Sequence, residues 1–315
     1  MRFYLESGAV SAVNNLSFQV GKGRCFGIVG ESGSGKTVTA LTIMGLISIP
    51  PARIDSGRIL FDGENLLTKT PKQMRDVRGK RIAMIYQDPM TSLNPVLRVG
   101  FQIAESIIVH EKLDRKAAYA KAIQLMEAVG IPEPEKRAKA YPHQFSGGMR
   151  QRIMIAMALS TDPEILIADE PTTALDVITQ AQILSLLKSL QKQRNMTVIL
   201  ITHDLGIVAE FCDEVMVMYA GMGMEHGTTA EIFANPMHPY TRGLLESITR
   251  IDRDIKRLNS IPGEIPNLLR PPSGCRFHPR CPYVFAKCKT DEPKEFMTPT
   301  GRFSKCWLSE SEKAN

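Results

Sequence analysis

The sequence predicts an α/β fold with an inserted block of helices and a small loop-rich extension at its C-terminal end. Short apolar runs that suit buried strands alternate with helical segments before residue 96 and after residue 160. Between them, residues 96–160 show helical spacing and no strand-like run. From about Ile251 the chain becomes rich in proline and cysteine.

These changes predict three parts. The α/β core would comprise residues 1–95 and 161–249, the helical subdomain residues 96–160, and the extension residues 250–315. The chain is long enough for one large domain and smaller additions.

The N-terminal part of the core is expected to be mostly strands. Alternation predicts a strand over Val13–Val20, and the apolar run Arg24–Val29 predicts a buried strand, followed by a helix over Val38–Leu46. Two further strands are predicted over Gly57–Gly63, at a sheet edge, and over Arg81–Tyr86.

The helical subdomain is expected to contain helices over residues 98–110 and 114–129 and a third over Met149–Leu159. Pro132, Pro134 and Pro142 predict a loop before that third helix.

Strands return at Ile165–Ala168, Thr197–Thr202 and Glu214–Tyr219. A helix over Asp176–Gln193 joins the first two, which are therefore expected to be parallel. Four methionines near the last strand are interpreted as core and edge residues rather than a metal site: Met216, Met218, Met222 and Met224.

Composition and charge narrow the classes of function. Hydrophobic residues make up 43% and charged residues 23%, as in ordinary globular proteins, and no apolar run is long enough to span a bilayer. With no signal-peptide pattern, a cytosolic location is expected, where cysteines remain thiols or metal ligands. The net charge of +6 is concentrated in residues 250–306, which hold 12 Lys/Arg and 6 Asp/Glu, so we expect no nucleic-acid partner.

A phosphate-binding loop is predicted at Gly30–Thr37, where G-x-x-x-x-G-K-T connects a buried strand to a helix. Glycines let successive backbone N–H groups face an anion, and the helix N-terminus adds positive potential. Lys36 supplies a cation for the phosphates, and the Thr37 hydroxyl is a ligand for Mg²⁺.

Two adjacent carboxylates end the strand that begins at Ile165. Buried acids are costly unless paired or metal-bound, so Asp169 is expected to hold Mg²⁺ and Glu170 to activate a water molecule. A second glycine-rich turn, Ser146–Gly148, begins a helix about twenty residues earlier, and two chains could share it across a head-to-tail interface.

With these motifs in order, the chain resembles the ATPases of ATP-binding cassette (ABC) transporters. Gly30–Thr37 matches Walker A, Ile165–Glu170 matches Walker B, and Ser146–Met149 matches the signature loop, although this reads Phe-Ser-Gly-Gly-Met rather than Leu-Ser-Gly-Gly-Gln. Gln87 matches the Q-loop, Ala174–Asp176 the D-loop and His203 the switch histidine. The resemblance implies a P-loop NTPase fold with a parallel sheet and an antiparallel β edge.

The residues in and after these motifs narrow the resemblance to one group of ABC ATPases. Gln87–Pro95, the run His238-Pro239-Tyr240-Thr241 with Leu244-Leu245, Pro262-Gly263 and the downstream cysteines resemble the dipeptide/oligopeptide permease ATPases, which include nickel and glutathione importers. The resemblance implies ATP hydrolysis that energises import of dipeptides or oligopeptides, with nickel, glutathione or another small solute as the alternative.

Roles for individual residues follow from this resemblance. Glu170, His203 and Gln87 would be catalytic, and Thr37, Gln87 and Asp169 would serve Mg²⁺. The residues implied to contact ATP are Phe3, Tyr4, Ser32, Gly33, Ser34, Gly35, Lys36, Thr37, Ser146, Gly147, Gly148 and Asp176. Adenine stacking would fall to Phe3 or Tyr4, near a terminus that we expect to fray.

The resemblance also implies the partners. A second ABC ATPase, either a homologue or another copy of this chain, would complete a head-to-tail dimer. Two membrane permease subunits would bind this dimer at the cytoplasmic face of the membrane, and a solute-binding protein would act indirectly. ABC ATPases that act on DNA or ribosomes carry long coiled coils or two cassettes, and this sequence has neither; Glu170 and His203 argue against a silent ATP-binding partner.

Four cysteines lie within the Pro-rich extension: Cys275, Cys281, Cys288 and Cys306. A segment with little apolar surface needs a staple, and in the cytosol that staple is a metal. Four thiolates suit Zn²⁺ or a [4Fe–4S] cluster; short C-x₂₋₄-C pairs typical of zinc are absent from the sequence, and some resembling ATPases carry a cluster here, so [4Fe–4S] is favoured, with a structural or redox-sensing role. Five nearby cations would offset the anionic charge: Arg276, Arg280, Lys287, Lys289 and Lys305.

Overall fold

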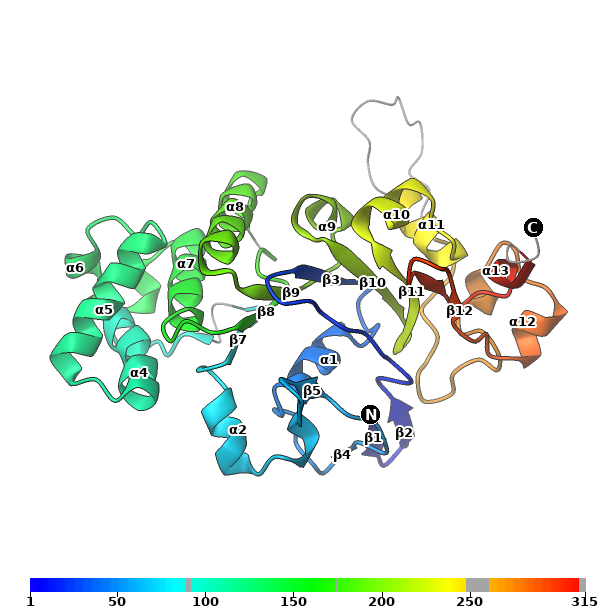
Figure 1. The fold of residues 1–315 in the computed structure, drawn as a ribbon, viewed down its shortest axis with the longest axis horizontal. Helices are drawn as coiled ribbons and strands as arrows, with labels where there is room; N and C mark the ends of the chain where they lie inside the picture. The colour runs from blue at the N-terminus through cyan, green and yellow to red at the C-terminus, as the bar shows by residue number, and fades with distance from the viewer. Residues whose placement is uncertain (89–91, 174, 248–260, 312–315) are drawn as a thin grey trace. The chain divides into compact units, whose positions relative to one another are not determined.

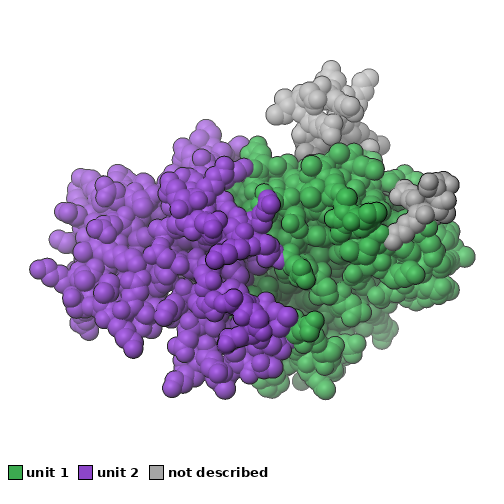
Figure 2. Space-filling view, viewed as in Figure 1, with its two compact units in different colours: residues 1–19, 25–59, 201–315 green, residues 20–24, 60–200 purple. Residues whose placement is uncertain are grey.

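The computed structural model describes residues 1–88, 92–173, 175–247 and 261–311. The chain divides into two compact units (Figure 2). Unit 1 comprises residues 1–19, 25–59 and 201–315, and unit 2 comprises residues 20–24 and 60–200. Pro89, Met90, Thr91 and Ala174 of the predicted Q- and D-loops, and the predicted boundary at residue 250, lie outside the described residues.

Unit 1 contains the phosphate-loop strand and the C-terminal extension (Figure 1). Its elements are β1 (Arg2–Leu5), β2 (Gly8–Ser11), β3 (Cys25–Val29), α1 (Lys36–Ile43), β4 (Ala52–Arg53), α9 (Leu205–Phe211), β10 (Glu214–Tyr219), β11 (Met222–Thr228), α10 (Thr229–Ala234), α11 (Pro239–Glu246), η3 (His278–Arg280), α12 (Ala286–Thr290), β12 (Phe296–Met297), β13 (Phe303–Ser304) and α13 (Leu308–Ser311).

Two sheets organise unit 1. In the larger, the strand order is β12-β13-β11-β10-β3, with β3 and β10 parallel and the other neighbours antiparallel. Every residue of β3 is buried, as its apolar run predicts, and Met216, Met218, Met222 and Met224 are at most 2% exposed, which confirms them as core residues. The smaller antiparallel sheet has the order β2-β1-β4.

Two expectations for the N-terminal region are wrong. β1 is the central strand of its sheet, paired on both sides, so the chain end does not fray as expected. Val13–Val20 forms no strand, because its backbone N–H groups reach separate partners rather than a ladder. Val13 donates to the carbonyl of Met1 and Asn14 to that of Gly221, and Asn15 takes a positive φ of 45°.

Unit 2 contains the helical block and strands on both sides of it in sequence. Its elements are β5 (Leu60–Phe61), β6 (Glu64–Asn65), η1 (Leu66–Thr68), α2 (Pro71–Val77), β7 (Ile82–Ile85), α4 (Val99–Glu111), α5 (Arg115–Ala128), α6 (Pro134–Arg137), η2 (Pro142–Gln144), α7 (Gly147–Ala158), β8 (Ile165–Asp169), α8 (Val177–Arg194) and β9 (Thr197–Thr202), whose last two residues belong to unit 1.

The helical predictions for this region are confirmed for α4, α5, α7 and α8, whose bounds lie within about two residues of those expected. β7 pairs with β8 in parallel, and β9 lies next to β8 in the sheet. The proline-rich stretch is not wholly a loop, because Pro134 stands at the first position of α6, where its missing N–H has no helical partner to lose.

The strand predicted over Gly57–Gly63 is shorter than expected. Only Leu60–Phe61 is extended, and it pairs with β6 across a two-residue turn. Asp62 and Gly63 both have positive φ, at 53° and 79°, as a type I′ hairpin turn requires.

The extension is not the separate appendage that the sequence suggests. β13 pairs with β11, placing Ser304 opposite Glu225, and β12 continues the ladder. The outer edge of β11 would otherwise leave a row of backbone donors and acceptors unpaired, so the extension completes the sheet.

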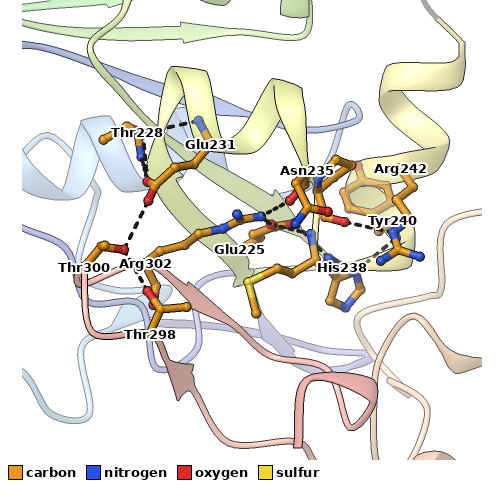
Figure 3. A network of polar contacts seen from close by, with 12 residues as sticks. Glu225, Thr228, Glu231, Asn235, His238, Tyr240, Arg242, Thr298, Thr300 and Arg302 are labelled. Atoms are coloured by element: carbon orange, nitrogen blue, oxygen red, sulfur yellow. Dashed lines mark hydrogen bonds and ion pairs between the residues drawn. The ribbon is translucent and has the colours of Figure 1, made fainter. Parts of the chain in front are cut away.

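A buried ion pair anchors this added edge (Figure 3). Arg302 Nη2 lies 2.7 Å from Glu225 Oε1 and also donates to the carbonyl of Asn235. The Glu225 side chain is fully buried and accepts the backbone N–H groups of Met237 and His238 at 2.8 and 2.9 Å. One carboxylate thus connects β11, the extension and the start of α11.

We predict that Arg302→Met lowers the free energy of unfolding by about 3–5 kcal/mol, because it leaves the Glu225 carboxylate buried without a cation. Urea denaturation measures the change. Arg58→Met, at an exposed arginine of the same unit, should stay within about 0.5 kcal/mol of the parent. A loss no larger than that of the control would contradict the assigned role of the pair.

Candidate active site

The phosphate loop leaves β3 at Gly30 and enters α1 at Lys36. Gly30 has φ 152°, and a Cβ there would lie 2.1 Å from the Met218 carbonyl oxygen. Gly35 has φ 99°, and a Cβ there would lie 2.5 Å from the Ala12 carbonyl oxygen. Backbone atoms crowd both positions, so only glycine allows this path.

The inside of the loop suits an oxyanion. A Cβ at Gly33 would meet no atom within 4 Å, and the Ser34 hydroxyl is buried with no hydrogen-bond partner in the described part of the chain. The Lys36 ammonium, 5% exposed, donates to the carbonyls of Gly30 and Glu31 at 2.7 and 3.0 Å. Ser32 and Thr37 are exposed at the loop surface. The residues present therefore fit a nucleotide's phosphates and Mg²⁺.

The other predicted residues of unit 1 are placed as follows. His203 is exposed and lies between the end of β9 and Asp204, which caps α9 by accepting the N–H groups of Gly206 and Ile207. Phe3 is half-buried in β1 and Tyr4 is 46% exposed. Their role in adenine stacking stays a prediction.

Glu170, the carboxylate predicted to be catalytic, is in unit 2. β7 and β8 run in parallel with Ile85 opposite Ala168, so Gln87 and Glu170 each follow two residues later. Gln87 Nε2 donates to Glu170 Oε2 at 3.0 Å, which brings these two predicted residues together. Asp169, at the end of β8, is 2% exposed.

Glu170 is held in an unusual backbone conformation. Its φ is 46°, in the left-handed region that few non-glycine residues adopt. The Thr173 hydroxyl donates to the same Oε2 at 2.8 Å. Strain of this kind is characteristic of functional positions, and here two donors fix one oxygen of the carboxylate. The role of Thr173 was not predicted from the sequence; its position three residues after Glu170, on a turn, was the available signal.

The signature loop of unit 2 is exposed. Ser146 caps α7, its hydroxyl accepting the N–H of Met149, and Ser146 and Gly147 are exposed. A Cβ at Gly148 would lie 2.6 Å from the Thr179 side chain, so this glycine lets α7 approach α8 closely.

Thr179 also contacts the D-loop, through Asp176. Asp176 caps α8, accepting the N–H of Thr179 at 2.9 Å and its hydroxyl at 2.7 Å. These two bonds hold the pKa of Asp176 below its ordinary value. Next to this carboxylate, Val177 and Ile178 are 81% and 73% exposed. Thr179, also missed from the sequence, thus organises both loops.

The four cysteines of the extension line one cavity. Cys275, Cys288 and Cys306 are each 8% exposed and Cys281 is half-buried. Burial, with the nearby Cys306 thiol, raises the pKa of Cys275 to about 12, and burial raises that of Cys306 to about 11. Within the described residues, no three His, Cys, Asp or Glu side chains form a group able to hold a metal ion.

The cations near these cysteines have other partners than expected. Arg280 pairs with Glu31, Lys287 with Glu310 and Lys305 with Glu295. Arg276 donates to the carbonyl of Ala220. Three of these cations, Arg280, Lys287 and Lys305, therefore have carboxylate partners within the protein.

In the described parts of the chain, none of the helices combines the length and apolar character needed to cross a membrane.

Comparison with known proteins agrees with this geometry. Residues 13–173 match the ABC transporter family, and residues 224–288 match the oligopeptide/dipeptide transporter C-terminal region. The chain is 51% identical over 308 residues to the dipeptide transport ATP-binding protein DppD of Bacillus subtilis, covering 98% of this chain and 92% of that protein. It is 48% identical to the oligopeptide transport ATP-binding protein OppD of Haemophilus influenzae, covering 100% and 96%.

A solved structure shows the same fold. The dimeric, post-hydrolysis state of an ATP-binding cassette bound to ADP and Pi matches 72% of this chain and 95% of its own, with a TM-score of 0.65 and 25% identity. With Walker A, Walker B, Q-loop and signature residues on the elements described above, the chain belongs to the ABC transporter family, among the ATP-binding subunits related to dipeptide and oligopeptide transporters, and it is an ATPase.

Proposed function

We propose that this chain hydrolyses ATP to energise import of dipeptides or oligopeptides across the cytoplasmic membrane, from its cytoplasmic face. The observation that carries the proposal is the match of residues 224–288 to the C-terminal region of oligopeptide/dipeptide transporters, on a chain that also has the Gln87–Glu170 pair. Nickel, glutathione or another small solute is the alternative cargo.

The roles of the site residues follow from their chemistry. Lys36 and the loop amides bind the phosphates, and Thr37, Asp169 and Gln87 would hold Mg²⁺, which neutralises phosphate charge. Glu170, held by Gln87 and Thr173, accepts a proton from the attacking water, and His203 steadies the γ-phosphate.

A dimer would complete the site. The exposed Ser146 and Gly147, with Gly148 and Asp176, would contact the nucleotide held by a second ABC ATPase, either a homologue or another copy. The solved cassette with ADP and Pi is itself dimeric. Two membrane permease subunits would respond to closure through the helical subdomain, residues 96–160, inserted in a core of residues 1–95 and 161–249.

For the extension, residues 250–315, we propose a [4Fe–4S] cluster on Cys275, Cys281, Cys288 and Cys306, with Zn²⁺ as the alternative. Four thiols on one cavity support a four-ligand site. The cluster is preferred to zinc because the sequence has no short C-x₂₋₄-C pair of the kind typical of structural zinc sites. Its role would be structural or redox-sensing.

We predict that Glu170→Gln lowers ATP hydrolysis by about 10²–10⁴-fold, because the water loses its general base, while ATP binding is retained. Phosphate release and nucleotide binding are measured on the same preparation. Glu127→Gln, an exposed residue on α5, is the charge-matched control. Hydrolysis by Glu170→Gln within a few-fold of the parent would show that Glu170 is not the base.

The cargo is tested in proteoliposomes that hold this chain, its partner ATPase and the two membrane subunits. Dipeptides or oligopeptides with their binding protein should stimulate ATP hydrolysis by about tenfold, a typical coupling between sites. Stimulation by Ni²⁺ or glutathione instead, with none by peptides, would select the alternative cargo.

Protein purified without oxygen should be brown, absorb broadly near about 400 nm and contain about four irons per chain. Cys288→Ser should lose the iron and the absorption, whereas Cys212→Ser, a buried cysteine outside the extension, should keep both. One zinc per chain in colourless protein would replace the cluster with zinc, and metal-free protein would remove the site.

A further inference from the structure

The extension holds the phosphate loop directly, through Glu31. Both oxygens of the Glu31 carboxylate accept from one guanidinium: Arg280 Nη1 lies 2.7 Å from Oε2, and Arg280 Nη2 lies 3.0 Å from Oε1. The Arg280 side chain is 5% exposed and that of Glu31 is 26% exposed. This two-pronged geometry is the strongest form of an arginine–carboxylate pair, and here it spans 249 positions of the sequence.

Contacts other than the one with Glu31 also orient the Arg280 guanidinium. Its Nε donates to the carbonyl of Pro262 at 3.0 Å and its Nη2 to that of Ile261 at 3.2 Å. The guanidinium also lies beside the buried Tyr219 ring, 5.7 Å from the ring centre. A planar guanidinium held by several contacts loses little conformational entropy when it pairs with a carboxylate, so Arg280 can hold Glu31 in one position.

A second group holds the backbone of the same residue. The Tyr240 hydroxyl accepts the Glu31 N–H at 3.0 Å. The Tyr240 ring is fully buried, 4.6 Å from Tyr219 and 5.3 Å from Phe277 between ring centres. This tyrosine belongs to the His-Pro-Tyr run, which the catalytic roles above leave unused.

The start of α11 fixes Tyr240 in turn. His238 Nδ1 accepts the Tyr240 N–H at 3.0 Å, and the His238 N–H is held by Glu225, the partner of Arg302 (Figure 3). The hydroxyl that meets the loop is therefore anchored through α11 to the sheet.

Glu31 matters because of what its own backbone holds. The Glu31 carbonyl accepts the Lys36 ammonium at 3.0 Å and the Ser34 N–H at 3.2 Å. Displacing Glu31 would displace both groups that line the phosphate position. An unpaired Glu31 carboxylate in this loop would also repel a bound polyphosphate.

We propose that Arg280 and Tyr240 are positioning residues of the phosphate loop, which fix Glu31 from its side chain and its backbone and so set the affinity for ATP. Neither residue touches the reacting atoms. The inference rests on ATP binding at this loop, and it makes that binding depend on the extension.

The test compares steady-state ATP hydrolysis and direct nucleotide binding in the assembled complex. Arg280→Met should raise both Kd and KM for ATP about tenfold and leave kcat within about twofold, because Glu170 and its donors are untouched. Arg280→Lys, which keeps the charge but loses the fork, should fall between. Tyr240→Phe should raise KM about fivefold by removing one acceptor. Arg270→Met, at an exposed arginine of the extension, should match the parent.

A double-mutant cycle isolates the contact. In a Glu31→Gln background, which lacks the carboxylate, Arg280→Met should change KM less than about twofold. An equal loss of ATP affinity in both backgrounds, or a fall in kcat with KM unchanged, would overturn the proposal. Lys36→Ala tests the nucleotide site separately from the positioning role. If Lys36→Ala keeps the parent's ATP affinity, the nucleotide site itself is refuted. If Lys36→Ala binds ATP weakly but Arg280→Met behaves like the parent, only the positioning role is refuted.

Discussion

A phosphate loop must keep its inward polar groups available for the phosphates, so bonds within the loop alone are not enough to fix its shape. In this chain the constraint is met from outside. The Gly221 N–H donates to the Ser34 carbonyl, the Ala12 carbonyl lies against Gly35, and Tyr240 and Arg280 hold Glu31. The turn between β10 and β11, the chain after β2, α11 and the extension thus form one support around the loop.

This requirement explains why the C-terminal part is joined so firmly to the sheet. β13 adds to the edge of β11, and the Arg302–Glu225 pair ties that edge to the start of α11. A buried ion pair contributes little net stability compared with apolar residues, but it fixes geometry because either partner alone is strongly disfavoured. Here the ion pair fixes the start of α11, and α11 in turn fixes the Tyr240 hydroxyl that accepts the Glu31 N–H.

The sequence predicted the elements whose pattern is local. Continuous apolar runs identified β3, β8, β9 and β10, and helical spacing identified α4, α5, α7 and α8. The predictions from sequence failed where hydrogen bonds between distant segments determine the structure. Val13–Val20 alternates like a strand, but its donors find separate partners, and the proline-rich extension reads as a loop although β11 recruits two short strands from it.

The same division holds at the site. Each of Gln87 and Glu170 was identified from its motif, and their contact follows from the register of β7 on β8, which a strand pattern alone does not specify. The roles of Thr173 and Thr179 are set by turns and caps around residues already singled out. Glu31 and Arg280 carry no shared local signal, because only the folded chain brings them together.

Arg280 immediately precedes Cys281, so the residue that pairs with Glu31 and a residue that lines the cysteine cavity are neighbours in the chain. Phe277 also links them, since it lines the cavity and packs against both Tyr219 and Tyr240. A small segment with few apolar residues depends on a staple for its order. On our proposals, a cluster or zinc ion bound by these cysteines would therefore also order the residues that hold the phosphate loop. Such a site would connect the cysteines physically to ATP binding without any contact between them and the nucleotide.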